Sequence, residues 1–274
     1  MKYQGHLSKM AISCDSDIAQ YRLKLGNVEI PLNEKIGQPI RIEYLGEIRC
    51  QACSRQTNKS FAQGYCYPCF AKLAQCDLCI MSPEKCHYHK GTCREPKWGE
   101  TFCMQDHIVY LANSSGIKVG ITRHSQVPTR WLDQGAMQAL PIARVATRQL
   151  SGLLEVIFKQ HVSDKTNWRT LLKQDAENLD LSLKRDELFE VCHAEIEELQ
   201  DEYGLLGVQL LYDAPQAEFR YPVNQYPTKV SSLNLDKNPL VEGKLMGIKG
   251  QYLLLDTGVI NLRKYSAYHV TIEC

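Results

Sequence analysis

Eight of the twelve cysteines lie between Cys50 and Cys93, and this clustering limits what the chain can fold into. The block from 49 to 99 is short of large aliphatic residues, so it cannot build a hydrophobic core of its own. In a reducing compartment, closely spaced thiols bind metal ions more often than they form disulfides. We therefore expect metal ions to hold this block together.

The first two cysteine pairs have the spacing of a zinc site. Cys50 and Cys53 are separated by two residues, as are Cys66 and Cys69, and twelve residues lie between the pairs. Each pair can place two thiolates on one tight turn, and two such turns give the tetrahedral sulfur cage that zinc prefers. Four protein ligands leave no open position for water, so we predict a structural zinc site of the zinc-ribbon or treble-clef type. An iron–sulfur cluster takes the same ligands, but the spacing fits zinc better.

A third cysteine pair precedes the stretch CHYHKGTC, which contains two further cysteines and two histidines. Two residues of this stretch would complete a second zinc cage. The two cysteines are preferred because the site is then all-thiolate like the first, while His87 and His89 remain alternatives. We predict a second structural zinc ion bound by Cys76, Cys79, Cys86 and Cys93.

Both ends of the chain alternate apolar and polar residues. Runs such as YRLKL and PIRIEYL within residues 1–48, and the pattern over 221–274, are typical of half-buried strands. We predict a β-rich segment at each end and expect the two to form one small barrel.

The middle of the chain predicts an α+β fold. Residues 105–173 read as strand, turn, strand, helix, strand, helix, which predicts a small antiparallel sheet flanked by helices. Residues 174–204 are acidic, with apolar residues at helical spacing and Gly204 at the expected end. We interpret this segment as a packed helix with a solvated outer face.

The order of residues in 105–173 resembles the GIY-YIG nuclease superfamily, whose core is a three-stranded antiparallel sheet flanked by helices. The resemblance is closest to the branch whose second motif reads Lys-Ile-Gly. The first triplet, Ile108-Val109-Tyr110, lacks its leading glycine, and a lysine replaces the tyrosine of the second motif. The residues that match the motifs are Tyr110, Lys118, Gly120, Arg130 and Glu155.

This resemblance implies catalytic roles for the hairpin. Tyr110 would take or relay the proton of the attacking water, helped by a cation that lowers its pKa from about 10. Lys118, on the neighbouring strand, is placed to be that cation. Gly120 would let the phosphate backbone approach the sheet without a Cβ in the way.

The helices would supply the phosphate clamp and the metal ligand. Arg130 matches the arginine that binds the scissile phosphate, with Arg123 as the alternative because the gap after the glycine is two residues longer than usual. Glu155 matches the helical glutamate that ligates Mg²⁺. His124 and His161 are candidate proton shuttles, although a lone histidine is more often a surface residue.

Over its full length the chain also resembles an uncharacterised bacterial family known as domain of unknown function 2797. The segments that carry this resemblance are KSFAQGYCYPCF, CHYHKGTC, VYLANSSGIKVGITR, PTRWLDQGA and DKTNWR. This second resemblance implies no activity.

Local charge indicates a polyanionic partner. The whole chain has a formal net charge of +1, which by itself identifies no partner. Residues 118–173 contain nine Lys or Arg against three Asp or Glu, whereas residues 174–202 contain two against eleven. We expect DNA or RNA as partner, with a protein partner as the alternative.

The chain reads as a cytoplasmic protein with no membrane association. No apolar run is long enough to span a bilayer, and MKYQGHLSKMAIS lacks the apolar core of a signal peptide. The predicted function is that of a zinc-stabilised, Mg²⁺-dependent endonuclease that hydrolyses phosphodiester bonds. The alternative is a non-catalytic zinc-binding adaptor for nucleic acid or protein that retains the fold.

Overall fold

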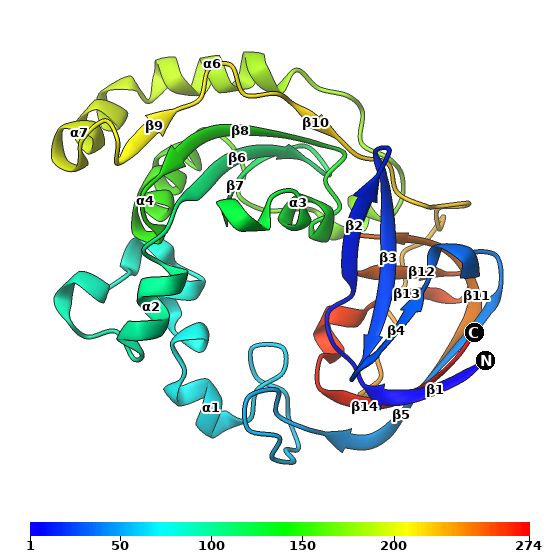
Figure 1. Ribbon diagram of the computed structural model, residues 1–274. Coiled ribbons are helices and arrows are strands. Elements are labelled where there is room, and N and C mark those ends of the chain that lie inside the picture. The colour runs from blue at the N-terminus through cyan, green and yellow to red at the C-terminus, as the bar shows by residue number, and fades with distance from the viewer.

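The computed structural model describes residues 1–274 as a mixed α+β chain with three antiparallel sheets. The strands of the terminal segments, the central sheet with its helices, and the cysteine-rich segment follow one another around an open ring (Figure 1). The strands are β1 (Lys2–His6), β2 (Ala11–Asp15), β3 (Ile18–Leu25), β4 (Val28–Pro31), β5 (Pro39–Ile48), β6 (His107–Asn113), β7 (Ile117–Arg123), β8 (Gln138–Val145), β9 (Val208–Leu210), β10 (Ala217–Glu218), β11 (Leu240–Lys249), β12 (Tyr252–Leu255), β13 (Gly258–Asn261) and β14 (Tyr268–Glu273). The helices are α1 (Tyr67–Lys72), α2 (Pro96–Phe102), α3 (Thr129–Asp133), α4 (Arg148–Phe158), α5 (Trp168–Leu171), α6 (Leu181–Val191) and α7 (His193–Tyr203).

The two ends of the chain meet in one six-stranded sheet with the order β1-β14-β5-β11-β12-β13. Ile272 of β14 lies opposite Tyr3 on one side and Ile42 on the other. The sheet is open, so the expected small barrel is wrong: β1 and β13 are its two edges and do not pair. Instead, β2, β3 and β4 form a separate sheet, and its buried face, which includes Tyr21 and Leu23, shares a core with the large sheet.

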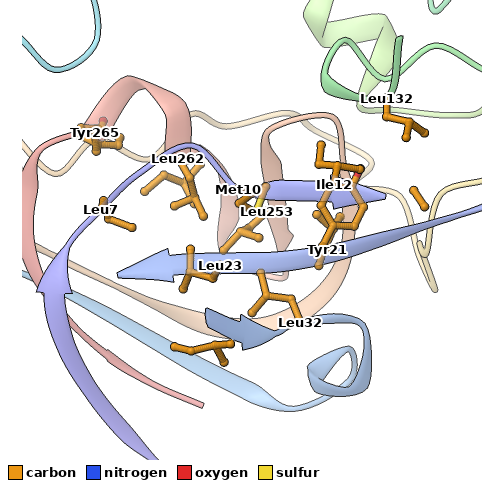
Figure 2. Close-up of a cluster of buried hydrophobic side chains, with 14 of the residues drawn as sticks. Leu7, Met10, Ile12, Tyr21, Leu23, Leu32, Leu132, Leu253, Leu262 and Tyr265 are labelled. Atoms are coloured by element: carbon orange, nitrogen blue, oxygen red, sulfur yellow. The ribbon is translucent and has the colours of Figure 1, made fainter. Parts of the chain in front are cut away.

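The central sheet has the order β10-β8-β6-β7, with β9 also paired to β8. Successive residues of β6 point to opposite faces. Val109 and Leu111 belong to a cluster with residues of α4, α6 and α7, whereas Ile108 and Tyr110 belong to a cluster of 33 buried residues that extends into the terminal sheets. Figure 2 shows Leu132 of α3 in this larger cluster together with Ile12 and Tyr21. The central and terminal units therefore share one core.

The helices cover the sheet through apolar faces. In α4, Leu150, Leu154 and Phe158 are buried, and the Thr147 hydroxyl caps the first turn by accepting a hydrogen bond from the Leu150 amide. The acidic segment forms two helices, α6 and α7, that break at Cys192. Two helices thus stand where one was expected over residues 174–204. Their buried residues join the same cluster, and their acidic side chains lie on the outer face.

The cysteine-rich segment differs from the rest of the molecule in how it is held. None of the three hydrophobic clusters contains a residue between Cys50 and Met104. The segment consists of α1, α2 and short 3₁₀ helices joined by turns. Along the whole chain, no helix combines the length and the apolar character that a membrane span requires.

Candidate functional site

A cleft of about 460 Å³ lies where the three parts of the molecule meet. The central unit supplies β7 and α4, the cysteine-rich segment supplies Ile80, Met81 and Phe102, and the terminal β unit supplies Lys9 and Arg263. A neighbouring hollow of about 880 Å³ shares several of these residues, so the two form one groove. The ionisable residues of the cleft are Lys9, Lys118, Arg123, Arg130, Arg148, Arg263, Asp133, Glu155 and Asp164.

Four of the five predicted catalytic residues line this cleft: Lys118, Gly120, Arg130 and Glu155. The fifth, Tyr110, lies beneath its floor. In the β6–β7 hairpin Tyr110 is opposite Gly120, and Ala112 is opposite Lys118, so these side chains share one face of the sheet. A Cβ at Gly120 would lie 2.8 Å from the Tyr110 hydroxyl oxygen. Gly120 is therefore required by the packing of the tyrosine ring as well as by any close approach of a ligand.

The Tyr110 hydroxyl is not the acidic group that the resemblance implies. The side chain is completely buried, and the hydroxyl donates a hydrogen bond to Gln134 Oε1 at 2.9 Å. Burial raises the Tyr110 pKa to about 12, against the opposing effect of Arg130. The expectation of a lowered pKa is thus wrong, because removal from water outweighs the neighbouring cation. The cation that opposes the rise of the Tyr110 pKa is Arg130 and not Lys118.

Among the cations that line the cleft, Lys118 loses its proton most easily. Its side chain is only 5% exposed, and the ammonium donates to Thr166 Oγ1 at 2.6 Å. Burial, together with the nearby Arg130, lowers its pKa to about 8. Glu155 and Asp164 act in the opposite direction.

Glu155 reaches the cleft from α4. Burial, followed by the charge of Asp164, raises the Glu155 pKa to about 7, while Lys159 and Arg148 oppose that rise. A carboxyl group whose pKa is raised to near 7, in a cleft with many cations, is a common feature of functional sites. Asp164 is a second carboxylate that lines the same cleft.

Arg130 and its predicted alternative, Arg123, both line the cleft. The Arg123 guanidinium stacks over the Phe102 ring at 4.1 Å from its centroid, while Arg130 also borders the neighbouring hollow. The two histidines considered as proton shuttles, His124 and His161, are exposed and do not line the cleft.

Two arginines of the cleft were missed by sequence reasoning. Arg148, at the start of α4, donates to the Ile80 carbonyl oxygen at 2.6 Å and so ties the helix to the cysteine-rich segment. Arg263 comes from the terminal β unit and donates to Gln63 Oε1 at 2.6 Å. The position of Arg148 next to a helix cap was a usable signal, but nothing local marks Arg263.

The first cysteine set has metal-site geometry. The sulfur atoms of Cys50, Cys53, Cys66 and Cys69 all lie within 4.8 Å of one another, and Cys53 Sγ is 3.7 Å from Cys66 Sγ. Tetrahedral zinc with bonds of about 2.3 Å has sulfur atoms about 3.8 Å apart. Burial opposes ionisation of Cys50, but hydrogen bonds from backbone amides, including that of Cys66, lower its pKa to about 6. This cluster can hold one zinc ion.

The second predicted set is brought together only in part. Cys79, Cys86 and Cys93 line one small internal cavity, whereas Cys76 borders the large groove. His87 lines the same cavity, and His89 does not.

Fold and site define a mixed α+β protein with a tetracysteine metal-type cluster and a basic cleft. The chain belongs to the family described as Protein of unknown function (DUF2797), which matches residues 37–270. Comparisons with curated proteins and with solved structures found no match.

Proposed function

We propose that the protein is a metal-dependent endonuclease with a GIY-YIG-like central unit, held in shape by zinc ions. The observation that supports this most is the convergence of Lys118, Arg130 and Glu155 in one cleft, above Gly120. These residues come from a strand and two different helices, and each side chain suits one requirement of phosphodiester hydrolysis.

Lys118 is the proton acceptor in this proposal. With a pKa of about 8 it is partly neutral near physiological pH, so it can accept a proton from the attacking water, which Tyr110 with its raised pKa cannot do efficiently. Tyr110 instead holds Gln134, which lines the cleft beside Arg130.

Arg130 and Glu155 serve to neutralise the negative charge of the phosphate and of the leaving oxygen in this proposal. The Arg130 guanidinium binds the scissile phosphate through paired hydrogen bonds. Glu155 is the residue that would hold a Mg²⁺ ion, which supplies stabilisation of the leaving oxygen when bound. Glu155 must be ionised for this, so cleavage rises with pH from about pH 6 to about pH 9 as Glu155 and then Lys118 lose their protons.

The partner in this proposal is DNA or RNA. Six basic residues line the cleft against three acidic ones, and Asp133 forms an ion pair with Lys9. A positively lined groove concentrates a polyanion and follows its phosphates.

Nicking of a mixed panel of DNA and RNA substrates, with and without Mg²⁺, tests the proposal. Lys118→Met, Arg130→Ala and Glu155→Gln should each lose at least about a hundredfold in rate. Matched changes outside the cleft, Arg144→Ala and Glu187→Gln, should retain the wild-type rate. Equal rates for the two groups of variants would reject the nuclease.

A second candidate function is a non-catalytic nucleic-acid binder with the same fold. The burial of the Tyr110 hydroxyl and its hydrogen bond to Gln134 favour it, because a hydroxyl in that state contacts no substrate. This binder would cleave nothing under any metal condition, yet would lose affinity when Arg130 is replaced by alanine. Binding and cleavage measured on the same substrates separate the two functions.

A further inference from the structure

A small internal cavity of about 10 Å³ lies inside the cysteine-rich segment. A space of this size accommodates one water molecule or one ion. Its lining includes four cysteines. The four cysteines are Cys79, Cys86, Cys93 and Cys103.

These cysteines come from four separate local elements. Cys79 lies in the 3₁₀ helix Leu78–Ile80, and Cys86 directly follows the 3₁₀ helix η4 (Pro83–Lys85). Cys93 lies before α2, and Cys103 directly follows its last residue. Each element is a few residues long and would not keep its position alone.

The main hydrophobic clusters do not explain why they converge. The segment supplies no member to any of the three hydrophobic clusters. A stretch without an apolar core needs a crosslink or a metal ion to fix its loops. Four cysteines that line a space for one ion offer the sulfur ligands that zinc prefers, although their sulfur atoms do not all lie within 4.8 Å of one another as those of the first cluster do.

The polar groups at the cavity are already engaged with one another. Asp77 Oδ2 accepts from Arg94 Nε at 2.6 Å and lies 3.6 Å from His87 Nε2. The other ring nitrogen of His87 lies 2.7 Å from Thr92 Oγ1. Asp77 and His87 approach Cys79 closely enough to share a metal ion with it, but their existing partners favour a role in orienting the loops.

We propose that Cys79, Cys86, Cys93 and Cys103 bind a second structural zinc ion. Cys76 is left out of this set, since it borders the large groove instead. The sequence does not reveal the set because its spacings contain no Cys-x-x-Cys pair, and Cys103 stands outside the cysteine block.

This second ion would fix one wall of the cleft. Ile80, Met81 and Pro83, which lie between Cys79 and Cys86, line that wall, and Phe102 directly precedes Cys103. The inference itself concerns metal content and does not depend on nuclease activity.

Zinc content of the purified full-length protein, measured by atomic emission, tests the inference. Wild type should contain two equivalents, Cys103→Ser one, and the matched control Cys76→Ser two. Cys53→Ser, which damages the first cluster, should also contain one.

Two equivalents in Cys103→Ser, or one in Cys76→Ser, would overturn the assignment. Should Cys103→Ser fail to fold, the wild-type protein still decides: one equivalent, or a disulfide between Cys86 and Cys103 found by mass spectrometry of anaerobically purified protein, rejects the site. Cobalt-substituted wild type should also show charge-transfer absorption for two all-thiolate sites.

Discussion

At the scale of single residues, two ionisable groups of the cleft have pKa values moved toward neutrality from opposite directions. Burial lowers the Lys118 pKa to about 8 and raises the Glu155 pKa to about 7, because in each case the charged form loses hydration. Both groups are therefore near their titration points under ordinary conditions. Burying either group in its charged form lowers the free energy of unfolding. A pKa near 7 or 8, however, suits a group that transfers protons or binds a metal ion.

Glu155→Gln should separate stability from activity. The folded-state pKa of about 7 is above the ordinary value of 4.5, so the native protein holds the proton more tightly than the unfolded chain does. Wild-type stability consequently falls as pH rises from about 4.5 to about 7, and the full cost is present above pH 7. Glutamine removes this cost, and we expect the variant to be more stable than wild type by about 1 to 2 kcal/mol at pH 8 and equal to it near pH 4.

Thermal melts of both proteins across this pH range measure the effect. Nuclease activity of the variant should be lost at every pH. A variant less stable than wild type at pH 8 would show that the carboxylate has a stabilising partner instead.

Tyr110→Phe tests the hydroxyl beneath the cleft. Removing it leaves the Gln134 amide without its partner at 2.9 Å and should lower the free energy of unfolding by about 1 kcal/mol. Cleavage should stay within about tenfold of wild type, because Lys118 rather than the tyrosine accepts the proton in the proposed reaction. A loss of a thousandfold in a single-turnover assay, at unchanged affinity, would return the proton-transfer role to Tyr110.

At the scale of elements, the contact between α4 and the cysteine-rich segment determines one side of the cleft. A Cβ at Gly152 would lie 2.3 Å from the Glu84 amide nitrogen and 2.7 Å from the Pro83 carbonyl carbon, so the backbone of η4 rests directly on the helix. Arg148, one turn earlier, donates to the Ile80 carbonyl oxygen. The helix that supplies Glu155 is thereby also the support for the loops that contain Cys79 and Cys86.

Gly152→Ala should disrupt this support. Backbone atoms cannot move aside as the end of a flexible side chain can, so the methyl group should cost about 2 to 3 kcal/mol despite the better helix propensity of alanine. Limited proteolysis should then cut between Cys76 and Cys103 faster than in wild type. Gln149→Ala, in the same helix, is the control and should leave both stability and proteolysis unchanged; an equally stable Gly152→Ala would mean that η4 docks elsewhere in solution.

Elements with a local pattern could be predicted from the sequence, and elements defined by distant partners could not. Alternation in YRLKL places Tyr21, Leu23 and Leu25 inward, and the two close cysteine pairs meet in one cluster. In contrast, β9 and β10 are three and two residues long, too short to show a period, yet both pair with β8. The open sheet was missed for a related reason, since alternation fixes which face is buried but not which strands become edges.

The same distinction applies to the candidate site. Tyr110, Gly120 and Lys118 could be placed together because a short hairpin sets their register. The burial of Tyr110 could not be foreseen, because α3 and the terminal β unit, which are remote in sequence, close over that face of the sheet. Its raised pKa is a direct consequence.

At the scale of the whole molecule, the cleft exists only because three parts of the chain line it together. The shared core of 33 residues fixes the terminal β unit against the central sheet. Contacts of Gly152 and Arg148 fix the cysteine-rich segment on the other side. Without both attachments, Lys9 and Arg263 of the terminal β unit would not lie beside the hairpin residues in the cleft.

Arg263 provides a test of this arrangement, because it lies in the terminal β unit yet lines the cleft with Arg130. If the proposed nucleic acid spans the cleft, Arg263 neutralises one phosphate, and Arg263→Ala should reduce the slope of log affinity against log salt by about 1. Arg22→Ala is the matched control, since Arg22 belongs to the same unit and is exposed outside the cleft. Affinities measured by fluorescence anisotropy at several salt concentrations give both slopes. Because Arg263 has no proposed role in the chemistry and its guanidinium donates to Gln63, the cleavage rate at saturating substrate should change little. Identical slopes for wild type and Arg263→Ala would place the bound nucleic acid away from the terminal unit and limit the interface to the central and cysteine-rich parts.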